Sequence, residues 1–109
     1  MTVKSSKEGI YSISSEGHAG LALSGKNIVC ASVSTLMLAL WLGLEEILKL
    51  DNVKKSIDKN KPEMCFEWDP GIPGAKILGQ TIAASFKALA NSYSDYVKYR
   101  EINQEDGME

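Results

Sequence analysis

Residues 17–34 read Gly-His-Ala-Gly-Leu-Ala-Leu-Ser-Gly-Lys-Asn-Ile-Val-Cys-Ala-Ser-Val-Ser, and the rest of the chain is arranged around them. This stretch contains His18, the single histidine, and Cys30, one of two cysteines. An uncharged run begins at Ile28 and predicts a helix, which puts Cys30 near a helix N-terminus. The helix dipole favours a thiolate at that end, and an imidazole within reach would complete a nucleophile and base pair.

The helix is predicted from Ile28 to about Leu50. One apolar stripe recurs at three- and four-residue steps, at Val29, Val33, Leu36, Leu40, Leu44 and Leu48. Trp41 belongs to a second apolar side, so the helix is expected to pack against more than one layer. Residues 28–44 carry no charge, and a membrane span is therefore the alternative. The run is short for a span and contains Ser and Thr, so we interpret it as a buried helix.

Alternating apolar and polar residues predict short strands on either side of this helix. We expect strands at 2–5, 10–14, within 51–61, at 64–68 and at 96–102, and a second helix at 75–92. Ile10 and Ile13 should lie on opposite faces of the second strand, and Gly9 should take a positive φ before it. This order predicts a single α+β domain over residues 1–109. Its two layers would be a mainly antiparallel sheet and two helices on one face.

Two loops invite functional interpretations. Residues 20–26 are predicted to be a loop, either a gate over a substrate or a plain connection. Residues 71–76 resemble a phosphate-binding loop only faintly, because the glycine spacing and the Ser or Thr after the lysine are missing. We interpret 71–76 as a structural turn. The lysine-rich segment 51–61 is interpreted as a solvated strand or loop rather than a nucleic-acid patch.

The composition excludes several classes of function. The net charge of the 109 residues is −2, which argues against binding RNA or DNA by phosphate neutralisation. Two cysteines are too few for a disulfide framework, and a catalytic thiol needs a reducing compartment, so we expect the cytoplasm. Residues 1–6 have no apolar core, so we expect no signal peptide. One histidine and two cysteines leave a zinc site one ligand short, and we expect no metal or cofactor.

Parts of the opening stretch resemble the signature of the ribosomal-processing cysteine proteases. The similar segments are Gly17-His18-Ala19-Gly20, Gly25-Lys26-Asn27-Ile28-Val29-Cys30-Ala31 and Val33-Ser34, and the spacing from histidine to cysteine matches the family pattern. These small bacterial enzymes remove an N-terminal extension from the large-subunit ribosomal protein L twenty-seven. The resemblance implies a two-layer fold, a homodimer and a ribosomal-protein precursor as the substrate. One position departs from the pattern, because the family usually has an aspartate where this chain has Asn27.

The resemblance implies a catalytic site built on Cys30 and His18. Cys30 would attack the scissile carbonyl and form a thioester, while His18 would hold the proton and pass it to the leaving amine. Backbone N–H groups at the helix start, including that of Cys30, would donate to the developing oxyanion. Gly17 and Gly20, which bracket the histidine, would support the site.

Asn27 and Ser34 are expected in supporting roles. The Asn27 amide oxygen can accept a hydrogen bond from the His18 ring but supplies no negative charge, so a weaker imidazolium and slower turnover are expected. Ser34 lies one helical turn beyond Cys30 on the same side. It would either donate to the thiolate or cap backbone carbonyls, and the sequence favours neither role.

Two functions remain in competition. The first is a cysteine endopeptidase that processes a ribosomal protein. The second is a non-catalytic module of the same fold that binds a peptide. Asn27, in the place of the family aspartate, favours this second function. If each residue is considered alone, Cys30 would be a buried packing residue and His18 would be an exposed residue without a functional role. The pair at the family spacing favours the protease. Cys65 is interpreted as a core residue.

Overall fold

The chain begins with two strands joined by a tight turn. The computed structural model describes residues 1–16, 24–58 and 63–103, without the side chains of residues 24–27 and 58. β1 (Thr2–Ser6) and β2 (Gly9–Ser15) pair antiparallel. Gly9 has a φ of 129° at the start of β2, which confirms the predicted positive φ. Glycine suits this position because other residues rarely adopt such a φ.

A β-bulge corrects the predicted facing of β2. Lys4 pairs with Ser12 and Ser5 pairs with Ile10, so Tyr11 is an extra residue between the two pairs. The extra residue breaks the simple alternation. Ile10 and Ile13 therefore both pack toward the core, and the prediction that they lie on opposite faces was wrong.

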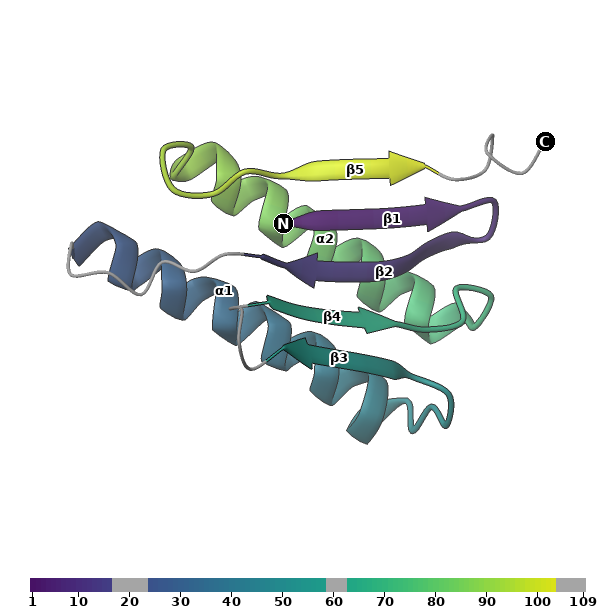
Figure 1. Cartoon of the computed structure of the whole chain (residues 1–109). Helices are drawn as coiled ribbons and strands as arrows, with labels where there is room; N and C mark the ends of the chain where they lie inside the picture. The colour runs from purple at the N-terminus through teal and green to yellow at the C-terminus, as the bar shows by residue number, and fades with distance from the viewer. Residues whose placement is uncertain (17–23, 59–62, 104–109) are drawn as a thin grey trace.

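Within the described part of the chain, five strands form one sheet in the order β3-β4-β2-β1-β5. The remaining strands are β3 (Lys54–Asp58), β4 (Glu63–Glu67) and β5 (Arg100–Asn103). Among the strand pairs that the described residues form, only β1–β5 is parallel. Both helices lie on one face of this sheet (Figure 1). The predicted two-layer α+β fold with a mainly antiparallel sheet is confirmed.

α1 (Ser24–Leu42) begins earlier than the sequence predicted and continues as a π-helical segment, η1 (Gly43–Ile47). Residues 24–26 are therefore helical, and their assignment to a loop was wrong. The error has a physical source. N–H groups in a first turn have no intrahelical partner, and residues such as serine and glycine are well tolerated at that end. Residues 20–23, the rest of the predicted loop, lie outside the described residues.

α2 (Pro73–Ser92) starts with proline at its first position, where the missing N–H costs no hydrogen bond. The preceding turn is closed by a hydrogen bond of 2.8 Å from the Gly71 N–H to Asp69 Oδ1. Residues 71–72 form a turn as interpreted, but residues 73–76 already belong to α2, so that part of the predicted turn and the predicted helix start at Ala75 were wrong. After α2, a turn in which the Val97 N–H donates to the Tyr93 carbonyl delays β5 to Arg100. The predicted last strand therefore began too early.

The core lies between the sheet and the two helices. Leu40 of α1, Leu44 of η1, Phe86 of α2 and Ile13 of β2 are all fully buried. Among the described residues, the segment Ile28–Ile47 is long and apolar enough to cross a membrane. Only 22% of this stretch is buried. Its buried side packs in the core cluster, whereas Ile28, Leu38 and Ile47 are exposed, so the predicted buried helix has an open apolar side.

Candidate active site

Cys30 lies in the second turn of α1, because the helix begins at Ser24. Its side chain is half-buried and its thiol is free. This position corrects one expectation about catalysis. Inside an α-helix the N–H of residue 30 bonds to a carbonyl one turn earlier, so it is not a free oxyanion donor. The unpaired N–H groups belong to the first turn, and the dipole effect also weakens beyond that turn.

One side of α1 carries the other site residues of the helix. Asn27 precedes Cys30 by three residues and Ser34 follows it by four, spacings that share a helix face. The Ser34 side chain is exposed. In this part of α1 it is Ser32 whose hydroxyl donates to a backbone carbonyl, that of Ile28, at 2.9 Å. The helix thus aligns these positions with Cys30, and their chemical roles stay predictions.

His18, Gly17 and Gly20 lie outside the described residues. The chain enters that segment from Glu16, which is held at the end of β2. Thr2 Oγ1 donates to Glu16 Oε1 at 3.3 Å, and Arg100 Nη2 donates to Thr2 Oγ1 at 3.2 Å. The nearby N-terminal amine donates to the Lys98 carbonyl. Burial lowers the pKa of this amine and Glu16 partly opposes the shift.

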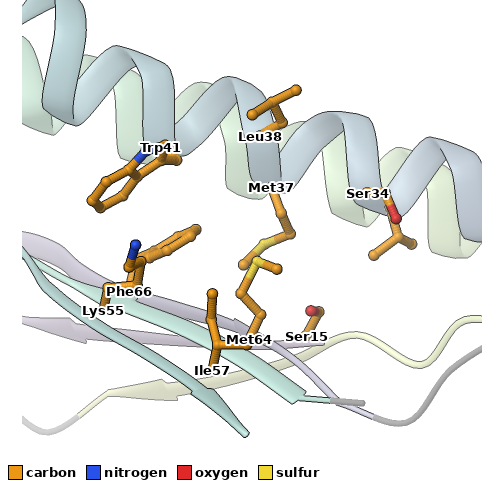
Figure 2. Close-up of a pocket in the computed structure, with 10 residues that line it drawn as sticks. Ser15, Ser34, Met37, Leu38, Trp41, Lys55, Ile57, Met64 and Phe66 are labelled. Carbon is orange, nitrogen blue, oxygen red and sulfur yellow. The ribbon is translucent and has the colours of Figure 1, made fainter. Parts of the chain in front are cut away.

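A groove lies between α1 and the strands β3 and β4. α1 supplies Ser34, Met37 and Trp41, while Ile57 comes from β3 and Met64 from β4. Figure 2 shows the helix on one side of this space and the strands on the other. Ser15 and Ser34 lie at the end opposite Trp41 (Figure 2). The groove was missed by sequence reasoning, because its two walls are remote in the chain.

Aromatic contacts close the far end of the groove. The rings of Trp41 and Phe66 stack with centroids 5.3 Å apart, and Lys55 Nζ lies 4.7 Å from the Trp41 centroid. An ammonium over an indole face is attracted by the ring quadrupole. Trp41 was predicted to lie on a second apolar side of the helix. In the structure its ring stacks on Phe66 at this end of the groove.

Cys65 occupies a different environment from Cys30. Its Sγ lies 3.6 Å from Ser12 Oγ of the neighbouring strand. It alternates along β4 with Phe66, which packs in the core, so Cys65 faces the side of the sheet without helices. Its predicted place in the core was therefore wrong. In residues 1–16, 24–58 and 63–103 no three His, Cys, Asp or Glu side chains gather as a metal site would need.

A comparison with models of protein families places the chain in a known group of enzymes. The model of the cysteine protease Prp family matches residues 1–98. The chain belongs to the cysteine protease Prp family. A curated relative, the ribosomal processing cysteine protease Prp of Mycoplasma genitalium, is 28% identical over 90 residues, covering 83% of this chain and 87% of the relative. The family resemblance inferred from residues 17–34 is confirmed, and the class of enzyme is cysteine protease.

Solved structures share the fold of this Prp family member. SMU.848 from Streptococcus mutans has a TM-score of 0.81 at 23% identity, covering 94% of this chain and 92% of that one. Prp from S. aureus, in complex with a substrate peptide, has a TM-score of 0.78 at 17% identity, with coverages of 92% and 95%. At these identities the likeness establishes the fold alone.

Proposed function

We propose that this Prp family member is a cysteine endopeptidase that removes the N-terminal extension of the ribosomal protein L twenty-seven precursor, with Cys30 as nucleophile. The match of residues 1–98 to the cysteine protease Prp family carries this proposal. The name of the Mycoplasma genitalium relative, a ribosomal processing protease, supports the substrate. Cys30 is favoured over Cys65 because it lies within the family segment and is one helical turn before Ser34, which lines the groove.

His18 is proposed as general base and acid. Ser15 lines the groove with Ser34, and Ser34 is one turn from Cys30. His18 follows Ser15 by three residues, a span of at most roughly 11 Å, so chain connectivity supports its approach to Cys30. Asn27 is proposed to accept a hydrogen bond from the ring.

The proposed chemistry has two halves. Cys30 loses its proton to His18 and its sulfur attacks the scissile carbonyl; collapse of the tetrahedral intermediate breaks the C–N bond as His18 gives the proton to the leaving amine. Water, deprotonated by His18, then hydrolyses the thioester and restores the thiol. Backbone N–H groups of the first turn of α1 are the proposed oxyanion donors.

Mass spectrometry of the processed precursor tests this function. The purified chain should shorten the host's full-length precursor, Cys30→Ala should not, and Cys65→Ala should retain activity. The two cysteine variants are matched because both thiols are free and half-buried. Failure of the wild-type chain to shorten the precursor, or cleavage by Cys30→Ala, would refute the proposal.

A non-catalytic peptide-binding module is the second candidate. Two observations favour it: Asn27 supplies no charge to an imidazole, and Cys30 lies beyond the first helical turn. Thiol alkylation near neutral pH separates the two functions. Both cysteines have intermediate exposure, so a large rate difference would report thiolate character rather than access. Much faster labelling of Cys30 supports the protease, and equally slow labelling of both thiols supports the binding module.

The homodimer that the family resemblance implies is proposed to form through the outer face of α1. Ile28 and Leu42 are 55% and 42% exposed, and the exposed residues Ala31 and Thr35 lie between them. Their spacing of three, four and seven residues places all four on one side of the helix. Sedimentation should give a dimer for the wild type and a monomer for Leu42→Glu. An unchanged mass for Leu42→Glu would refute this interface.

The proposed location is the cytoplasm. A catalytic thiol requires a reducing compartment, and both cysteines of the chain are free. Fractionation of the host with an antibody to this chain would test the location, and recovery outside the cytoplasmic fraction would contradict it.

A further inference from the structure

The groove between α1 and the strands β3 and β4 has the size of one large side chain. Its volume is about 220 Å³. An apolar cavity of about 150 Å³ is enough to bind benzene, whereas sites for drug-sized ligands have roughly 300–1,000 Å³. The groove therefore suits one Leu, Met or Phe side chain better than a cofactor.

The walls of the groove are apolar and adaptable. Met37 and Met64 face each other across it (Figure 2), and methionine adjusts readily to the shape of a bound group. Leu38 and Ile57 line the groove although they are 56% and 52% exposed. An apolar side chain seated in the groove would remove their surfaces from water, which is favourable.

The groove lies in line with the catalytic cysteine. Cys30, Ser34, Met37 and Trp41 are spaced by four, three and four residues, so they share one side of α1. At a rise of 1.5 Å per residue, Met37 is about 10 Å from Cys30 along the helix and Trp41 about 16 Å. An extended peptide advances about 3.3 Å per residue, so it reaches these positions after about three and five residues.

Given the proposed protease function, on which this inference rests, we propose that the groove is a specificity subsite. It binds one apolar side chain of the substrate, three to four residues from the scissile bond. The end at Ser15 and Ser34 is the end nearer to Cys30 along α1, and Trp41 with Lys55 closes the other end. An acidic or basic side chain would lose its hydration in the groove. Lys55 would also repel a basic one.

A peptide series tests the position of the subsite. Peptides that span the processing site receive aspartate at one residue after another, and kcat and KM are measured for each. Aspartate three or four residues from the scissile bond should lower kcat/KM roughly 10- to 100-fold, the discrimination usual for apolar pockets. Tolerance of aspartate at both of these distances would overturn the proposal.

Variants of the groove test the partner side chains. Leu38→Ser and Ile57→Ser should raise KM about 10-fold with little change in kcat, since binding is lost without loss of catalytic groups. Ile77→Ser is the matched control, because Ile77 is 66% exposed on α2 and does not line the groove. When the apolar substrate residue is replaced by alanine, the wild type and the groove variants should have similar KM values. Equal losses on the apolar and the alanine peptides would overturn the proposal.

Binding to Cys30→Ala separates this inference from the protease function. If the wild-type chain cleaves nothing, the protease proposal fails. Fluorescence titration of the same peptides into Cys30→Ala then decides the subsite. Binding weakened by Ile57→Ser and by aspartate at the same peptide position supports the groove as a peptide site. Binding indifferent to both changes overturns it.

Discussion

Alanine substitutions at Met37 and Leu40 test whether the space left by a lost core side chain opens into the groove. Both side chains are buried in the core, at 1% and 0% exposure, and only Met37 also lines the groove. Replacement by alanine removes the same number of heavy atoms from each residue, and Met and Leu have similar helix propensities. A difference between the two variants would therefore report what fills the space left behind.

The expected costs differ because a cavity term adds to the transfer term. Losing the buried atoms costs about 2.4 kcal/mol in either variant, at about 0.8 kcal/mol per methylene-sized group. Leu40→Ala also leaves a closed cavity, so its total should be about 3–5 kcal/mol. The space left by Met37→Ala joins a groove of about 220 Å³, where solvent and the flexible Met64 can enter. Its cost should stay at about 2–3 kcal/mol.

Urea unfolding measures these costs. With a slope of about 1.5 kcal/mol per molar, the midpoint should fall by about 2–3 M for Leu40→Ala and about 1.5 M for Met37→Ala. Met37→Leu preserves the volume and should cost less than about 1.5 kcal/mol. A loss for Met37→Ala as large as or larger than that for Leu40→Ala would refute the inference that the space left by Met37→Ala joins the groove.

Three further predictions concern the backbone and pH. Gly9→Ala should lower the free energy of unfolding by about 1–2 kcal/mol, because φ is 129° there. Lys49→Gly should raise it by about 0.5–1 kcal/mol, because Lys49 has a φ of 54°; thermal melts check both signs. Burial, followed by the hydrogen bond to Glu101, raises the pKa of Tyr99 above its ordinary 10.0. The folded phenol then keeps a proton that the unfolded chain releases, so stability falls as the pH rises above about 10. Tyr99→Phe should reduce this fall in melts from pH 8 to 11, Tyr96→Phe should reduce it less, and equal slopes would contradict the assignment.

Local pattern sufficed wherever a segment has one buried face. The alternation that predicted a strand at 64–68 matches β4, and Phe66 and Trp68 are both buried, because a strand turns every second side chain to the same face. Ile82 and Phe86 of α2 are buried at helical spacing for the corresponding reason. The family signature at residues 17–34 was also readable, because it depends on residue types and spacing alone.

Pattern failed where distant segments decide the outcome. The bulge at Tyr11 depends on how β2 pairs with β1, and pairing registers are not encoded within either strand. The start of α1 at Ser24 was missed for a local reason, because weak helix formers cost little in a first turn. This early start places Cys30 in the second turn of the helix.

The sequence by itself determined the layers, the family and the identity of the candidate nucleophile, since each follows from local periodicity or from a motif. Only the tertiary structure decided which face of the sheet the two helices cover and that a groove lies between α1 and the strands β3 and β4. Trp41 and Ile57 form opposite sides of this groove although they belong to separate elements. Their meeting depends on the packing of a helix across two strands, a long-range geometry that no local pattern of residues contains.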